Sequence, residues 1–147
     1  MPELPEVETT LKAIKSFEKK VLNSISIHNP NLRWLVDNNI NKKIAGKKIR
    51  QILRRAKYLI FDFNDYQLIV HLGMSGTLRI MNKKDNFFKK HDHAELTFSK
   101  NKLIYNDPRR FGSIHITKNY KEHFLIKNLG PEPCLLYTSP SPRDNKA

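Results

Sequence analysis

Residues 58–72 read YLIFDFNDYQLIVHL, and this segment decides the fold class. Its two halves, Tyr58–Phe63 and Gln67–Leu72, are dense in β-branched and aromatic residues, which favour strands. Asn64-Asp65 lies between them, and both residue types are favoured in tight turns. The segment therefore predicts two antiparallel strands joined by a short hairpin turn.

Strand signals continue on both sides of this hairpin, at intervals typical of an all-β sandwich or barrel. The expected strands are Val21–His28, Ile49–Leu53, Thr77–Met81, Ala94–Phe98, Leu103–Tyr105 and Ser113–Thr117. Residues 5–19 carry apolar side chains at helical spacing, namely Val7, Leu11, Ile14 and Phe17. A second short helix is expected over Asn119–Asn128, ended by Gly130-Pro131. We therefore expect a mainly β protein with flanking helices: a two-layer β-sandwich with an N-terminal amphipathic helix.

The composition indicates a single domain without a membrane span. The chain has 147 residues, and no apolar run approaches the length that crosses a bilayer. Its acidic, amphipathic start is unlike a secretory signal peptide. Cys134 is the one cysteine, which excludes an internal disulfide and any multi-cysteine zinc site within this chain. We expect a cytoplasmic, nucleoid-associated location.

The charge indicates a polyanionic partner. The chain has 27 Lys+Arg against 14 Asp+Glu, a formal net charge of +13. Such an excess favours nucleic acid as the partner. The alternative is a lysine-rich, well-solvated surface, and lysines such as Lys42, Lys43, Lys47 and Lys48 are scattered rather than grouped in a motif.

The first residues, MPELPE, allow an unusual nucleophile. If Met1 is removed, Pro2 presents a secondary amine, and α-amino groups have a pKa of about 7.7–8.0, against about 10.4 for lysine. Such an amine can attack a sugar aldehyde, and the resulting iminium withdraws electrons from the neighbouring carbon and favours elimination there. The alternative is an ordinary helix start, since proline and glutamate both suit the first turn of a helix.

Four further segments carry a family resemblance: RRAKYL (54–59), HLGMSG (71–76), KHDH (90–93) and DPRRFG (107–112). Together with the opening PELPEVET (2–9), and in this order, they resemble the formamidopyrimidine-DNA glycosylases, bacterial base-excision enzymes for oxidised purines. The resemblance runs from Met1 to about Pro133, including LGPEP (129–133). It implies that residues 1–133 are the N-terminal catalytic β-sandwich domain, roughly the first half of a family member.

The resemblance also implies catalytic roles. Pro2 matches the nucleophile that attacks the deoxyribose C1′ and forms a Schiff base. Glu3 matches the acid that protonates the sugar ring oxygen. Lys57 matches the lysine associated with β-elimination, although it could instead position a phosphate, and taken alone it is one lysine among many.

The same resemblance assigns DNA contacts to His91, Arg109, Met74 and Phe111. Met74, Arg109 and Phe111 match side chains that fill the gap left by a flipped nucleotide, since a damaged base must leave the stack before it can be excised. Their segments have the glycines and proline of loops. As alternatives, Met74 could fold back onto the core, and the Arg109–Phe111 segment could be a plain solvated turn. The alternation of His91 and His93 could indicate a metal site, but two histidines without a clear third ligand argue against one.

The expected function is that of a bifunctional DNA glycosylase/AP lyase in base-excision repair, removing 8-oxoguanine and formamidopyrimidines and then cleaving the strand. The expected partner is damaged double-stranded DNA, with no membrane partner, and the expected state is a monomer. One alternative is an endonuclease VIII-like glycosylase for oxidised pyrimidines. The other is a non-catalytic domain that binds damaged DNA.

The end of the chain departs from the family pattern. Residues 134–147 are rich in Ser and Pro, resemble translated adapter sequence, and are expected to be disordered. A family member would continue into a helix–two-turn–helix domain and a four-cysteine zinc finger. We expect no cofactor within this chain, one zinc in the full-length family member, and weak activity of this fragment alone.

Overall fold

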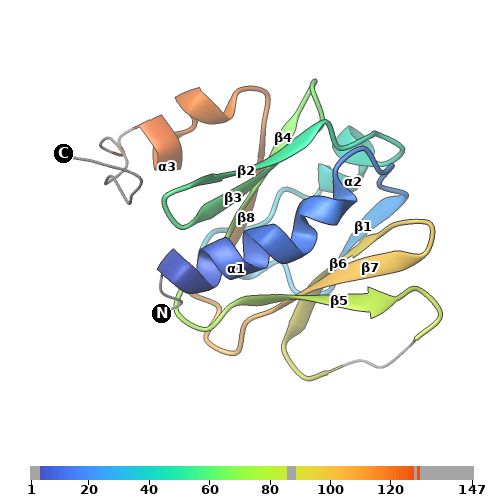
Figure 1. Ribbon diagram of the computed structural model, residues 1–147. Coiled ribbons are helices and arrows are strands. Elements are labelled where there is room, and N and C mark those ends of the chain that lie inside the picture. Colours follow the sequence, from blue (N-terminus) through green and yellow to red (C-terminus); the bar gives the residue numbers. More distant parts are fainter. Residues whose placement is uncertain (1–3, 86–88, 128, 130–147) are drawn as a thin grey trace.

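Two four-stranded antiparallel sheets pack face to face in the computed structural model, which describes residues 4–85, 89–127 and 129 (Figure 1). The first sheet has the order β1 (Ser24–Ile27), β6 (Asp92–Thr97), β7 (Asn101–Asn106) and β5 (Thr77–Asn82). The second has the order β2 (Gln51–Arg55), β3 (Tyr58–Asp62), β4 (Gln67–His71) and β8 (Ser113–Thr117). The predicted β-sandwich is confirmed.

The hairpin of residues 58–72 is also confirmed. β3 pairs with β4 in a register that runs from Tyr58↔His71 to Asp62↔Gln67. Asn64 has a φ of 73°, a left-handed conformation that asparagine tolerates better than most residues. The Phe63 amide donates to the Tyr66 carbonyl at 2.8 Å and closes the turn.

The nearly continuous apolar character of β3 and β4 has a structural cause, because both faces of the second sheet are covered. Leu59 and Phe61 point inward to the core between the sheets, together with Leu68 and Val70. The alternate residues face outward, where a smaller cluster gathers Ile60, Ile69 and Ile126. A strand buried on both faces cannot show polar alternation.

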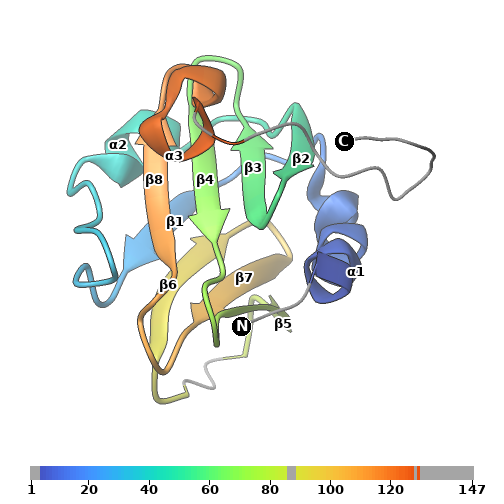
Figure 2. The same ribbon diagram turned by 90° about the vertical axis from the view of Figure 1, so that its left-hand side faces the viewer.

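The N-terminal helix is shorter than predicted. α1 spans Leu4–Ile14 and continues as a 3-10 turn, η1, over Lys15–Phe17. The helix lies across one open side of the sandwich (Figures 1 and 2), and Val7, Ile14 and Phe17 are buried in the core. It does not reach residue 19, because Lys19 adopts a left-handed φ of 73° and its amide donates to the Ile49 carbonyl instead.

The remaining helices are short. The helix predicted over 119–128 is two separate turns, η2 (Tyr120–Glu122) and α3 (Phe124–Lys127), interrupted at His123, whose backbone is extended. α2 (Ile40–Ile44) was not predicted, because five residues are too few to display a helical period. No helix in the described part of the chain is long and apolar enough to span a membrane. The expected disordered tail, 134–147, lies outside the described residues.

Candidate functional site

Two glycine-containing loops meet at one end of the second sheet. The loop of residues 72–76 follows β4, and the loop of residues 107–112 precedes β8; both lie at the lower end of the sheet in Figure 2. A Cβ atom on Gly73 would lie 2.5 Å from the Gly112 nitrogen, and Gly73 has a φ of +67°. The backbones therefore touch at a point where no side chain fits.

Asp107 is the carboxylate that organises this junction. It is fully buried and accepts three hydrogen bonds: from the Ser75 hydroxyl at 2.7 Å, the Tyr105 hydroxyl at 2.6 Å and the Gly112 amide at 2.9 Å. Burial and the adjacent carboxylate raise the pKa of Tyr105 far above its ordinary value, so that its hydroxyl remains a donor. His93 Nε2 donates to the Asp107 carbonyl at 2.7 Å. One side chain thus ties both loops to the first sheet.

The loop tips carry three of the predicted DNA-contacting residues. Met74 is 41% exposed and Phe111 is 46% exposed. Arg109 of the second loop contacts the first: its amide donates to the Ser75 hydroxyl at 3.3 Å, and its guanidinium lies 3.9 Å from the Met74 sulfur. The structure therefore brings Met74, Arg109 and Phe111 together on one surface, and the alternative that Met74 fills the core is wrong.

A basic hollow of about 380 Å³ adjoins these tips. Its lining includes Arg33, Arg109 and Arg110, with Phe111 beside them. Arg33 is held there because its amide donates to the Gly112 carbonyl at 3.2 Å. Sequence reasoning missed Arg33, which belongs to none of the quoted segments.

Lys57 lies at the same end of the second sheet, in the turn between β2 and β3. The turn is tight, since Ala56 has a left-handed φ of 54°. Lys57 precedes Tyr58, which pairs with His71 at the end of β4 and stacks on the His71 ring at 4.6 Å. Burial, and then the positive charges of Arg33 and Lys57, lower the pKa of His71. His71 is a second residue that the sequence analysis did not propose for the site. The feature that could have indicated it is a polar residue directly after the apolar run of β4.

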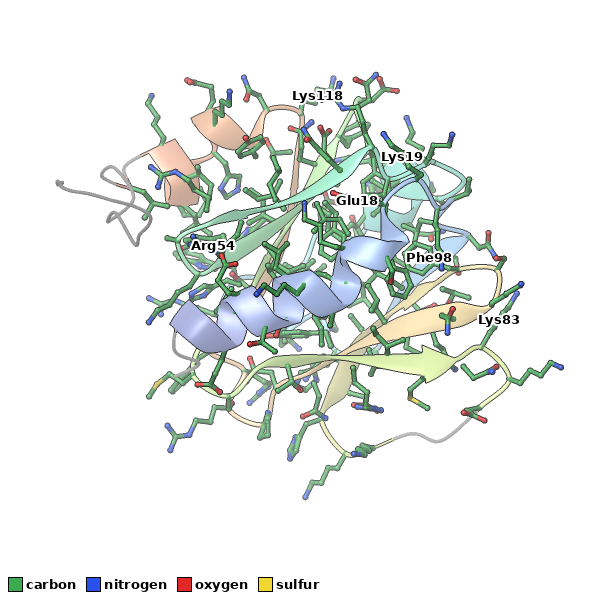
Figure 3. The ribbon with its side chains drawn as sticks, viewed as in Figure 1. Glu18, Lys19, Arg54, Lys83, Phe98 and Lys118 are labelled. Carbon is green, nitrogen blue, oxygen red and sulfur yellow. The ribbon has the colours of Figure 1, made fainter. Side chains whose placement is uncertain are left out.

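The start of α1 is held beside this end of the sheet. The Arg54 guanidinium pairs with Glu8 of α1 and donates to the Ala56 carbonyl at 2.9 Å (Figure 3). A cleft of about 350 Å³ lies between α1 and the loop after β4, lined by Glu6, Thr10, Met74 and Ser75 among others. Pro2 and Glu3 lie outside the described residues, and their roles stay predictions.

His91 lies in the turn before β6, on the other sheet. Its φ is 71°, and its carbonyl accepts from the Asp107 amide at 3.1 Å, which connects this turn to the junction of the two loops. Its ring centroid lies 6.2 Å from that of His93. Among the residues that the structure describes, no group of three or more His, Cys, Asp or Glu side chains could hold a metal ion. The described residues therefore do not fit a zinc centre.

Comparison with known proteins decides the family. The model of the formamidopyrimidine-DNA glycosylase N-terminal domain matches residues 1–114. The chain belongs to the formamidopyrimidine-DNA glycosylase family. The formamidopyrimidine-DNA glycosylase of Alcanivorax borkumensis is 44% identical over 135 residues, and that of Hydrogenovibrio crunogenus 47% identical over 136. These matches cover 90% of the chain but 49% and 48% of the relatives, so the chain spans about half the length of the curated relatives it matches.

Solved structures of the family share the fold. The chain resembles Lactococcus lactis Fpg in complex with DNA containing FAPY-dG, with a TM-score of 0.79 and 36% sequence identity. A complex of the same protein with abasic-site DNA gives a TM-score of 0.80 at 36% identity. The matches cover 89% and 90% of this chain and 51% of each Lactococcus lactis chain. The resemblance read from the sequence is confirmed.

The first prediction concerns the buried carboxylate. Asp107→Asn replaces one acceptor oxygen with an NH₂ group that faces existing donors, so the free energy of unfolding should fall by about 2 kcal/mol or more. Tyr105→Phe removes a single hydrogen bond to the charged carboxylate and should cost about 1.5 kcal/mol. Urea unfolding measures both. Equal stability of Asp107→Asn and the unmodified chain would show that the carboxylate does not hold the loops.

The second prediction concerns pH and the turn that carries His91. Burial alone would raise the pKa of Asp92, but hydrogen bonds from Arg79, Asn106 and the Lys89 amide outweigh it and lower the pKa from 3.8 to about 2. A lowered pKa contributes stability above pH 3.8 that is lost as pH falls towards 2, here about 2 kcal/mol.

Urea unfolding between pH 5 and pH 2 tests this contribution. Asp92→Asn should lose less stability on acidification than the unmodified chain, because the titrating group is gone. The matched control is Asp85→Asn, which removes an exposed carboxylate from the segment between β5 and β6. This variant should keep the pH profile of the unmodified chain. Identical acid profiles for Asp92→Asn and the unmodified chain would contradict the assignment.

Proposed function

We propose that this chain carries the catalytic half of a DNA glycosylase/AP lyase that acts in base-excision repair, within residues 1–133. The observation that carries the proposal is the convergence of Met74, Arg109 and Phe111 on two loops that Asp107 locks together, beside the cleft at the start of α1. The proposed partner is damaged double-stranded DNA. Its support is the basic hollow at the loop tips and the DNA-bound state of the Lactococcus lactis relatives.

The loop tips are suited to holding an opened duplex. A flipped nucleotide leaves a gap in the base stack, and unstacking costs a few kcal/mol. Exposed apolar side chains such as Met74 and Phe111 can enter such a gap, and the Arg109 guanidinium can donate to the orphaned base. Rigid loops favour this role, because the insertion then requires little ordering on binding.

The proposed chemistry begins at the processed amino terminus. The Pro2 nitrogen attacks the deoxyribose C1′ and gives up its proton, and the damaged base departs in protonated form. Glu3 then protonates the ring oxygen as the C1′–O bond of the ring breaks, which leaves a cationic iminium between Pro2 and C1′. The iminium acidifies the adjacent carbon, and β-elimination then cleaves the strand. Lys57 either assists this elimination or holds a phosphate, and its place beside His71 at the same end of the sheet supports a role at the DNA.

Oxidised purines, namely 8-oxoguanine and formamidopyrimidines, are the proposed lesions. The family model and the Lactococcus lactis complex with FAPY-dG DNA support this choice. The rival within the enzyme class, an endonuclease VIII-like glycosylase, would prefer oxidised pyrimidines, and a panel of lesion duplexes separates the two. A non-catalytic binding domain would bind damaged DNA without forming a covalent adduct.

The nucleophile is tested by borohydride trapping on an abasic-site duplex, where the aldehyde is already available. With protein in excess, the unmodified chain should yield a covalent complex, and Pro2→Gly should yield much less. Pro5→Gly is the matched control, because it makes the same substitution without touching the terminal amine. Trapping that survives when Met1 is retained behind an uncleaved extension would overturn the assignment of Pro2.

A further prediction concerns affinity. The given sequence matches about half the length of its relatives, so these residues tested by themselves offer fewer phosphate contacts than a full-length relative, and fewer neutralised phosphates mean weaker binding. In mobility-shift and nicking assays on an 8-oxoguanine duplex, we expect weak binding and little turnover compared with Lactococcus lactis Fpg. Turnover equal to that of the longer protein would refute this.

A further inference from the structure

A second basic surface lies at the opposite end of the second sheet, around the β3–β4 hairpin. We call it the basic end and define it by six cationic side chains: Lys19, Lys43, Lys47, Lys48, Arg50 and Lys118. Figure 3 shows Lys19 and Lys118 near this hairpin, while Arg54, beside the proposed active site, lies towards the other end. Lysines that look scattered in the sequence therefore gather in space.

The fold fixes these cations in two groups. The segment after α1 pairs with the segment before β2: the Lys19 amide donates to the Ile49 carbonyl, and the Lys19 ammonium donates to the Arg50 carbonyl at 3.1 Å. The second group surrounds one aromatic ring. The ammonium groups of Lys43, Lys47 and Lys118 lie 5.9, 5.6 and 5.9 Å from the centroid of Tyr66.

The carboxylates nearby neutralise only part of this charge. Asp37 pairs with Lys43 at 2.7 Å, Asp65 with Lys47 at 2.8 Å and Asp62 with Arg50 at 2.6 Å. Glu18 is engaged by Lys15 and the Ile52 amide. Within the described parts of the chain, Lys48 and Lys118 form no salt bridge with a carboxylate, and the charge of Lys19 is offset only by its attraction to Glu18, which Lys15 also pairs with. The basic end therefore carries an excess of positive charge around a hollow of about 520 Å³.

We infer that the basic end binds the phosphate backbone of a second DNA segment, independently of sequence. Lysine ammonium groups bind phosphates as point charges, and clustered lysines at a hollow match a polyanion better than a single anion. Nucleic acid fits better than a lipid surface. The hollow is lined by Lys19, Lys47, Lys48, Arg50, Phe63, Asn64 and Asp65, of which only Phe63 is a large apolar residue, and it is 3% exposed and so unable to enter a bilayer.

The two surfaces lie at opposite ends of the second sheet. β3 has five residues and at about 3.3 Å per residue separates these ends by about 16 Å. A duplex held on the Met74 and Phe111 loops therefore leaves the basic end open to another segment. The chain would then bridge two duplexes and pass from one to the other. This inference relies on the proposed function only for the identity of the first surface.

The test is a bridging assay with two short undamaged duplexes, one carrying a donor fluorophore and one an acceptor. Energy transfer should appear when the unmodified chain is added at low salt. The variant Lys47→Gln/Lys48→Gln/Lys118→Gln should weaken bridging about tenfold and reduce the salt slope of this step by about 2 to 3, at about 0.9 per lost phosphate contact.

The matched control is Lys83→Gln/Lys84→Gln/Lys100→Gln, which removes the same charge from exposed lysines that line another hollow, at the far end of β5. It should bridge within twofold of the unmodified chain, and thermal melting checks that both variants fold. Equal losses in both variants would overturn the inference in favour of bulk charge, as would binding to phosphatidylserine vesicles without any second duplex. Borohydride trapping on the same variants separates the proposals: bridging without trapping contradicts the proposed function alone, and trapping without bridging contradicts this inference alone.

Discussion

The hydrogen bonds of the buried Asp107 carboxylate are the interaction on which the proposed site depends. An ionisable group with no exposed surface is costly to bury unless its oxygens are satisfied, and here a hydroxyl from each of two segments and a backbone amide satisfy them. The partners belong to different parts of the chain, so the bonds form together only when both sheets are in place. These bonds also fix the positions of the side chains at the loop tips. Arg109 is placed by its amide bond to the Ser75 hydroxyl, and its guanidinium in turn contacts the Met74 sulfur.

The second sheet has a different set of functional residues at each of its two ends. Antiparallel pairing places the turn before Tyr58, the end of β4 and the start of β8 at one end, which is why Lys57, His71 and the two loops are neighbours. The same pairing places the β3–β4 hairpin and Lys118 at the other end. The second sheet thus presents a basic surface at each of its two ends.

The sequence predicted the parts of this structure that are encoded locally. The hairpin of 58–72, the sandwich and the loop character of 73–76 and 108–112 follow from strand propensity, turn residues and glycines, and all are confirmed. The helix predicted over 5–19 ends early because the Lys19 amide donates to the Ile49 carbonyl, which is distant in sequence. The single helix predicted over 119–128 was also wrong, because the backbone is extended at His123 and divides it into two short turns.

Other features were beyond sequence reasoning for a related reason. In the sequence, Asp107 looks like an ordinary turn residue, and only the structure shows the hydrogen bonds that it accepts from Ser75, Tyr105 and Gly112. In the same way, His71 looks like the last residue of a strand, and only the structure shows that the charge of Lys57 acts on it. The charge of Lys47 and Lys48 is visible in the sequence, but its concentration with Lys118 depends on pairing between distant segments. Long-range contacts, rather than residue type, supply this information.

We propose that the Pro2 nitrogen forms the covalent bond to the sugar of a damaged nucleotide. Peptide mapping by mass spectrometry of the borohydride-reduced complex locates the bond between protein and DNA directly. We expect the modified residue to be Pro2, linked through its nitrogen to the sugar carbon. A modified Lys57, or any other lysine of the chain, would contradict the claim.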